Sequence, residues 1–291
     1  DGRAPGIWTL SQQAYWQKQG LWPIAGNSQL GVFGGGQAAS NTNTIVYVNI
    51  GTTGNATSWG VLTTDSSGNA GCASSVRGIL QASSSELNYI TFASIGNAVS
   101  FGNLIGSKSR AGACSSSTRG IYAGGNTTVT TIEYITIATT GNGTSFGNLS
   151  VSRYGLSGLA SPTRGVFGAG INGATYYSTI DYVTIATTGN AASFGNLSAS
   201  IIYPAACSNS TRGVYAGGGN NSVNTNVIEY VTIATTGNAT DFGDLTLART
   251  SPSGAASSTR AIFVGGENVV GPRYNVIDYV TIATTGNATD F

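Results

Sequence analysis

The sequence predicts an all-β protein: a β-propeller of six four-stranded antiparallel blades, preceded by a short helical arm. Three observations predict this fold class: a repeat of constant spacing, glycine-rich turns between short apolar segments, and apolar residues on both faces of the most repeated segment. In each copy, a tyrosine is followed at fixed intervals by a glycine and then by an aromatic residue. A period this strict indicates a repeat architecture. The six tyrosines are Tyr47, Tyr89, Tyr134, Tyr182, Tyr230 and Tyr279.

Composition narrows the range of partners. Charged residues make up 8% of the 291 residues and the net charge is +1, which argues against charge-driven binding to nucleic acid or to a membrane surface. No apolar run approaches the length of a transmembrane helix, so we expect no membrane insertion. The 43 glycines indicate many tight turns. The three cysteines, Cys72, Cys114 and Cys207, share one phase of the repeat, so we expect small buried side chains and no disulfides among them.

The arm comprises residues 1–21, which lie outside the repeat. Thr9 or Ser11 can cap a short helix that ends at Gly20. Trp8, Trp16 and Trp22 cluster around this helix. A short helix rich in tryptophan is not stable alone in water, so we expect it to dock on its own propeller or on another protein.

The propeller is predicted over residues 22–291. In its last unit, residues 253–257 form a strand a of small residues and residues 260–266 form an apolar strand b. After a loop, residues 276–283 form strand c, and residues 288–291 open strand d beyond a Thr-Thr-Gly-Asn turn. The Gly-Asn pair suits a turn with positive φ. In the first unit, residues 22–26 take the place of strand a.

Strand c indicates how the sheets pack. In residues 228–233, Ile228 and Tyr230 point to one face, while Val231 and Ile233 point to the other. Both faces must therefore be covered, and the sequence offers no helices to cover them. Sheets stacked face to face around an axis satisfy this requirement, and that arrangement is a propeller.

One end of the propeller is predicted to vary. The spacing from turn glycine to next strand-b arginine is constant, but the spacing from that arginine to the next tyrosine is not. Length variation is therefore confined to the b–c loops, which emerge beside the d–a links, where Lys108 and Arg153 lie. We predict binding at this end, because tyrosines among Asn and Ser suit sugar stacking or a protein contact, although they could equally pack between loops. The candidates are Tyr154, Tyr176, Tyr177, Tyr203, Asn220, Arg273 and Tyr274.

The sequence favours a non-enzymatic protein without metal or cofactor. It contains no histidine, which excludes Ser-His-Asp and Cys-His nucleophile arrangements, and it has no cluster with metal-ligand spacing. Five arginines share one position of the repeat, at the start of strand b. We expect each to contact a carboxylate or carbonyl at the surface or between blades. The alternative is that they form a ring of cations that binds an acidic sugar. They are Arg77, Arg119, Arg164, Arg212 and Arg260.

Four strand-c carboxylates also share one phase of the repeat. We expect them to pair with these arginines or to lie at an edge. A glycosidase pair would need two of them within about 5–10 Å. The four are Glu133, Asp181, Glu229 and Asp278.

The repeat resembles the kelch repeat. A glycine pair after strand b, the tyrosine of strand c and the aromatic of strand d carry the resemblance, as in Gly217-Gly218, Tyr230 and Phe242. Phenylalanine mostly replaces the tryptophan of that family, and the glycine pair is broken in the second and fourth units. The resemblance implies a propeller and covers most of the chain.

A second resemblance lies in the arm. Gly6-Ile-Trp-Thr-Leu-Ser-Gln-Gln, followed by Lys18-Gln-Gly-Leu-Trp-Pro23, is similar to a short motif of bacteriophage tail and virion proteins. It implies a virion structural or appendage protein (tail fibre, collar or capsid decoration) that is assembled in the host cytoplasm as part of a larger assembly. The arm would bind other virion proteins, and the variable end would bind a host glycan or receptor. The alternatives are a secreted or cell-surface bacterial carbohydrate-binding propeller and, less favoured, a glycan-cleaving enzyme.

Overall fold

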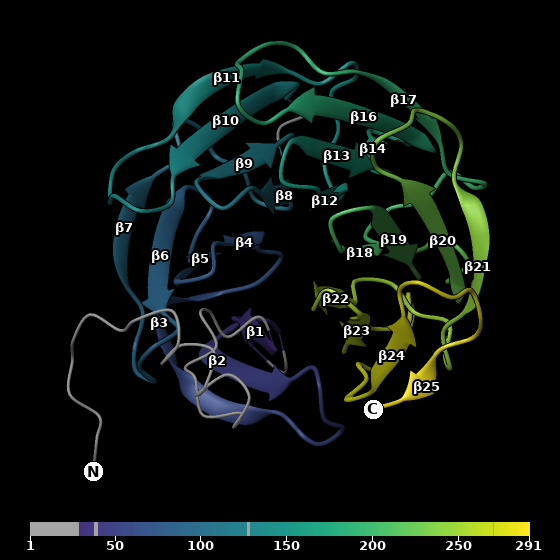
Figure 1. Cartoon of the computed structure of the whole chain (residues 1–291), viewed down its shortest axis with the longest axis horizontal. Coiled ribbons are helices and arrows are strands. Elements are labelled where there is room, and N and C mark those ends of the chain that lie inside the picture. Colours follow the sequence, from purple (N-terminus) through teal and green to yellow (C-terminus); the bar gives the residue numbers. More distant parts are fainter. Residues whose placement is uncertain (1–28, 38–39, 127–128, 270) are drawn as a thin grey trace, which may run out of the picture.

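The computed structural model describes residues 29–37, 40–126, 129–269 and 271–291. Over these residues the protein is all-β, and six antiparallel sheets surround a central axis as the blades of a propeller (Figure 1). The described residues form no helix. The predicted arm, with Trp8, Trp16 and Trp22, and the predicted strand a of blade 1 lie outside the described residues.

Each blade is a meander in which consecutive strands pair. Blade 1 contains β1 (Leu30–Gly34), β2 (Thr42–Asn49) and β3 (Thr57–Ser66). Blade 2 contains β4 (Gly71–Ala73), β5 (Arg77–Gln81), β6 (Glu86–Thr91) and β7 (Val99–Asn103). Blade 3 contains β8 (Gly112–Ser115), β9 (Arg119–Ala123), β10 (Thr131–Thr136) and β11 (Thr144–Asn148).

Blades 4 to 6 repeat this order as predicted strands a to d. Blade 4 contains β12 (Ser157–Ala160), β13 (Arg164–Gly168), β16 (Thr179–Thr184) and β17 (Ala192–Asn196). Blade 5 contains β18 (Ala205–Ser208), β19 (Arg212–Ala216), β20 (Val227–Thr232) and β21 (Thr240–Asp244). Blade 6 contains β22 (Ser253–Ala256), β23 (Arg260–Val264), β24 (Ile277–Thr281) and β25 (Thr289–Asp290). Strand a of each four-stranded blade lies nearest the axis (Figure 1).

The hydrophobic core lies between the blades. One cluster joins Ile121 of β9 to Phe167 of β13 and Val183 of β16, and equivalent clusters fill the other interfaces. Val48 of β2 packs with Ile262 of β23, so the last blade contacts the first and the ring closes. The prediction that both faces of strand c are covered by neighbouring sheets is therefore confirmed.

The repeated tyrosine and aromatic pack together across strands c and d. The rings of Tyr134 and Phe146 meet edge to face, with centroids 6.1 Å apart and planes at 78°. Aromatic pairs prefer this geometry because the positive ring edge faces the negative ring face. The same contact recurs in every blade, which explains why the spacing of these residues is constant.

In blades 2 to 6, the c–d turn fastens the blade to strand d of the preceding blade. Gly141 N–H donates to the carbonyl of Phe101 at 2.9 Å, and the Asn142 side chain accepts from the N–H of Asn103 at 3.0 Å. A Cβ at Gly102 would collide with the carbonyl of Gly141. The Gly-Asn pair was predicted to suit a positive-φ turn. The glycine does so in blades 1 and 6, with φ of 151° at Gly54 and 155° at Gly286, but no turn asparagine has a positive φ. Its side chain is what the inter-blade contact requires.

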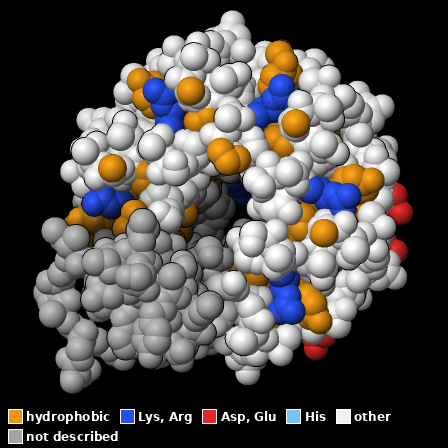
Figure 2. All heavy atoms as spheres, in the orientation of Figure 1, with side chains coloured by type: hydrophobic (Ala, Val, Ile, Leu, Met, Phe, Trp, Pro, Cys, Tyr) orange, Lys and Arg blue, Asp and Glu red, His pale blue; other side chains and the backbone are white. Residues whose placement is uncertain are grey.

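The strand-b arginines also join neighbouring blades. The Arg119 guanidinium lies 4.2 Å above the Tyr134 ring and donates to the carbonyls of Ile185 and Ala186 in blade 4 at 2.8 and 3.0 Å. Arg77, Arg164 and Arg212 repeat the arrangement, and Arg260 closes the ring by donating to Ile50 at 3.0 Å. The expected inter-blade carbonyl contact is confirmed. Basic and hydrophobic side chains recur together around one face (Figure 2).

Three of the four strand-c carboxylates pair with cations of the d–a links. Asp181 lies 3.1 Å from Arg153, and Glu133 lies 3.4 Å from Lys108. Our expectation that these carboxylates pair with the strand-b arginines is therefore wrong. Lys108 and Arg153 lie in the d–a links, as predicted, but they offer no surface for binding, because their side chains are only 1% and 0% exposed. A buried cation needs a carboxylate partner, and strand c supplies it.

The glycine pair makes room for these cations. In blade 3, Gly124 and Gly125 have φ of 67° and 120°, and a Cβ at Gly125 would lie 2.8 Å from the Cα of Lys108. The pair that is broken in blade 4 keeps the same backbone, because Ala169 takes a φ of 68° before Gly170 at 115°. Backbone geometry is thus conserved between blades where the residue type is not.

All three cysteines are free, as predicted. Cys114 and Cys207 are buried, and Cys72 is partly buried with its Sγ 3.5 Å from the Tyr122 hydroxyl. Burial raises the pKa of the Cys72 and Cys207 thiols to about 12, because the thiolate would lose its hydration.

Candidate binding surface

The b–c loops and d–a links lie together at one end of the propeller, which we call the variable face. Bridges pair the link before a blade with the loop within it: Tyr154 with Ile171, Ile202 with Gly219, and Thr250 with Glu267. The prediction that these segments share one end is confirmed. The opposite end, formed by the a–b and c–d turns, is the fixed face.

The b–c loops differ in structure as well as in length. In blade 4 the loop folds into a hairpin of β14 (Ile171–Asn172) and β15 (Thr175–Tyr176). In blade 2 it is a short turn in which Ala82 N–H donates to the carbonyl of Glu86 at 2.8 Å. One scaffold therefore presents a different outline at each blade.

The predicted binding residues lie on this face but form separate groups. The Tyr176 hydroxyl donates to the Asn221 side chain, which links the loops of blades 4 and 5 beside exposed Asn220. Arg273 pairs with Glu267 at 3.4 Å in blade 6, with both side chains partly exposed. Tyr177 and Tyr274 are half-buried, and their N–H groups donate to Gly170 and Gly266 at 2.9 and 2.8 Å. These side chains pack between loops and also leave surface for a partner.

Five link residues form what we call the axial ring: Gly68, Arg110, Gly155, Tyr203 and Ser251. From Arg110 onward, each N–H donates to the carbonyl of the preceding member, at 2.9, 2.8, 2.8 and 3.0 Å in order. Each member has a left-handed backbone, with φ between 55° and 68°. Because each precedes an innermost strand, this hydrogen-bonded chain runs around the axis at the variable face (Figure 1).

Arg110 and Tyr203 place a guanidinium and an aromatic ring close together on the axial ring. The guanidinium carbon of Arg110 lies 5.8 Å from the centre of the Tyr203 ring. Burial raises the pKa of Tyr203 to about 12, opposed by the Arg110 charge and reinforced by Tyr154 and Glu267 nearby. Tyr203 and Tyr154 were predicted from the sequence, and Arg110 and Glu267 were not. The available signal was that Arg110 occupies the same phase of the d–a link as Tyr203.

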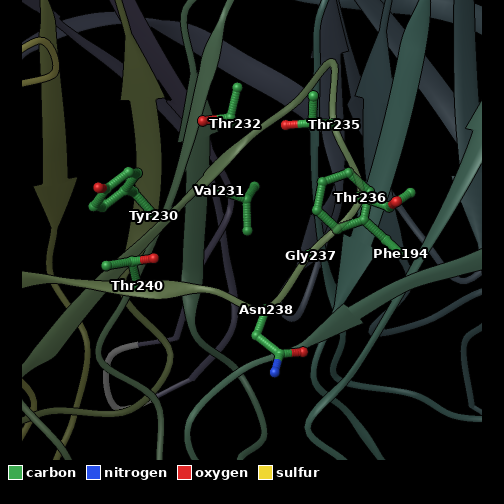
Figure 3. A pocket seen from close by; sticks show the side chains of 9 residues that line it. All are labelled: Phe194, Tyr230, Val231, Thr232, Thr235, Thr236, Gly237, Asn238 and Thr240. Atoms are coloured by element: carbon green, nitrogen blue, oxygen red, sulfur yellow. The ribbon is translucent and has the colours of Figure 1, made fainter.

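The fixed face carries shallow inter-blade grooves. One has a volume of about 160 Å³ and lies between Phe194 of blade 4 and the c–d turn of blade 5, where Thr235, Thr236 and Asn238 line it (Figure 3). A groove of the same volume lies between Trp59 of blade 1 and the corresponding turn of blade 2. Tyrosine is the only titratable side chain in either groove. Both are built from residues that already fasten neighbouring blades.

The described part of the chain contains no group of three or more His, Cys, Asp or Glu residues placed to hold a metal ion. Nor does it contain a helix long and apolar enough to cross a membrane. No family model matches the chain, and a search of curated proteins gave no match.

Proposed function

We propose that the chain is a non-enzymatic virion structural or appendage protein of a bacteriophage, such as a tail fibre, collar or capsid decoration protein, whose variable face binds a partner. The partner is a host receptor or glycan, or another virion protein. One observation carries the recognition role: sequence and length vary at one face, whereas the other face is fixed by repeated inter-blade hydrogen bonds. Loops on a rigid scaffold are where proteins place binding residues.

The virion assignment and the kelch-like assignment rest on sequence resemblance. The motif from Gly6 to Pro23 supports the first. The glycine pairs support the second, because they share one left-handed backbone in several blades. The proposed arm, residues 1–21, would bind other virion proteins through Trp8, Trp16 and Trp22, and would attach the propeller to the particle.

A secreted or cell-surface bacterial carbohydrate-binding propeller is the second candidate. The half-buried tyrosines Tyr154, Tyr176 and Tyr203 favour it, because a partly exposed aromatic ring suits the apolar face of a sugar. Both candidates use the same face and differ in what carries the protein.

Binding by the variable face can be tested with the fluorescent protein on a panel of bacteria and on a glycan array. We expect Tyr176→Ala with Tyr274→Ala to weaken binding and Thr236→Ala, on the exposed fixed-face turn, to leave it unchanged. Absence of binding to every cell and glycan, or the reverse pattern of variants, would contradict the receptor role. Immunogold labelling of phage particles distinguishes the virion candidate from labelling of the bacterial envelope.

A further inference from the structure

The axial ring holds bulky side chains where the backbone favours glycine. A left-handed φ costs a non-glycine residue roughly 1–2 kcal/mol. Gly68 and Gly155 fit this geometry, but Arg110 and Tyr203 occupy it at φ of 61° and 55°. The fold itself accepts glycine at these positions, so their side chains are not needed to close the ring.

Arg110 differs from the other described cations. Every other Lys or Arg in the described residues donates to a backbone carbonyl or pairs with a carboxylate. The Arg110 side chain is exposed, and it contacts Tyr203 through the face of the ring and a side-chain hydrogen bond. A guanidinium without an anion, fixed at the axis, is suited to bind one from solution.

Gly155 separates Arg110 from Tyr203 in the ring. It receives the hydrogen bond from Tyr203 N–H and donates to the carbonyl of Arg110, both at 2.8 Å. A Cβ at Gly155 would lie 2.8 Å from the Tyr203 ring, so the absence of a side chain there lets this ring lie toward Arg110. The cation and the aromatic ring thus share one small surface beside Tyr154.

We propose that Arg110 and Tyr203 form a binding site for a carboxylate-bearing saccharide at the axial end of the variable face. The guanidinium would hold the carboxylate through two parallel hydrogen bonds, and the tyrosine ring would contact the apolar face of the sugar. This proposal rests on the proposed function, because it names the ligand class of the same face.

The test uses polygalacturonate, hyaluronan and polysialic acid, each beside its carboxyl-reduced form, with the full chain. We expect binding to at least one acidic polymer and not to its reduced form. Arg110→Gly should lower the affinity by about tenfold or more, since a charge-assisted hydrogen bond is lost. It should not lower the melting temperature, because glycine suits a φ of 61°.

Ser251→Gly is the matched control, because it relieves the same backbone geometry at φ 58° without removing a cation. It should bind as the wild type does. Equal binding to the reduced polymers, unchanged affinity of Arg110→Gly, or tighter binding of polyglutamate than of any acidic saccharide would overturn the proposal. If no polymer binds but the protein still binds bacteria through Tyr176 and Tyr274, this inference fails and the proposed function stands. If neither binds, both fail.

Discussion

At the scale of single residues, the buried position where a d–a link meets strand c holds different side chains in different blades. Blades 3, 4 and 6 pair a link cation with a strand-c carboxylate, for example Arg249 with Asp278 at 2.8 Å. Blade 2 has neutral Asn88 at the carboxylate position, which accepts from Thr63 N–H at 2.9 Å. Blade 5 keeps the carboxylate of Glu229 but has apolar Ile201 in place of the cation, and Ser198 N–H donates to it at 2.9 Å.

This difference predicts unequal effects of two neutralising substitutions. Asp181→Asn leaves the buried Arg153 without its anion and should lower the free energy of unfolding by about 3 kcal/mol or more. Glu229→Gln removes no cation's partner and keeps an oxygen for Ser198, so its effect should stay below about 1 kcal/mol. Urea denaturation of both variants measures the difference. Equal losses would show that the ion pair is not what stabilises the site.

The thiols predict a loss of stability at alkaline pH. The folded-state pKa of Cys72 and Cys207 is raised to about 12, so the unfolded chain loses these protons first as pH rises. The free energy of unfolding should therefore fall between about pH 9 and pH 12 and be unaffected by these groups below that range. Urea midpoints measured across this range check the sign, and Cys72→Ala with Cys207→Ala should flatten the slope. An unchanged slope would contradict the assignment to these thiols.

At the scale of elements, the contact between a c–d turn and the preceding strand d sets the spacing of the blades. Gly189 N–H donates to the carbonyl of Phe146 at 2.8 Å, and Asn190 accepts from Asn148 N–H at 3.0 Å. The turn approaches so closely that strand d must have glycine at Gly147. The facing glycine, Gly189, differs from Gly147 in that it has room for a side chain, because nothing lies within 4 Å of a Cβ placed there.

These two glycines provide a matched pair of substitutions. In Gly147→Ala the new Cβ collides with the Gly189 carbonyl, and overpacking of this kind costs about 1–3 kcal/mol. Gly189→Ala meets open space and should change the free energy of unfolding by less than about 0.5 kcal/mol. Thermal and urea denaturation compare them directly. A similar loss in both variants would mean that close approach of the turn is not the constraint.

The sequence predicted strands, their order and the variable end, because these follow from local periodicity and constant intervals. It did not predict the role of Asn142, since a Gly-Asn pair within one turn carries no sign of the neighbouring blade. The burial of Arg153 was missed for a related reason: its partner Asp181 is distant in sequence and meets it only once blade 4 has folded. Arg110 was missed because a left-handed arginine has no local signature.

At the scale of the whole molecule, the ring is closed by contacts without a covalent link between blades 6 and 1. Val48 packs against Ile262, and Arg260 donates to the Ile50 carbonyl at 3.0 Å. In a repeat protein, stability is roughly a sum of unit and interface terms. Closure gives the terminal blades a second neighbour and should make unfolding a single cooperative transition.

A substitution at the interface between blades 6 and 1, which we call the seam, should make blade 6 unfold locally before the other blades. Arg260→Leu removes the carbonyl contact and the cation–π contact with Tyr279, so amides of β24 should exchange hydrogen faster than those of β10. Arg164→Leu is the comparison, because the backbone also connects blades 4 and 5, whose interface Arg164 joins. It should lower the free energy of unfolding without making one blade exchange selectively. Hydrogen exchange resolved by blade measures both variants. Uniform exchange in Arg260→Leu would show that the seam is no weaker than the linked interfaces.

The asparagine of the c–d turn also bears on the chemical ageing of the protein. Asn142 precedes Gly143, and an asparagine followed by glycine is the dipeptide most prone to deamidation, in which the next backbone nitrogen attacks the side-chain carbonyl. In the folded ring that carbonyl accepts from Asn103 N–H, and Gly143 N–H donates to the Asn103 carbonyl at 2.8 Å. Both reacting groups are thus held by the neighbouring blade. The contact that spaces the blades therefore also protects the side-chain amide of Asn142 from deamidation.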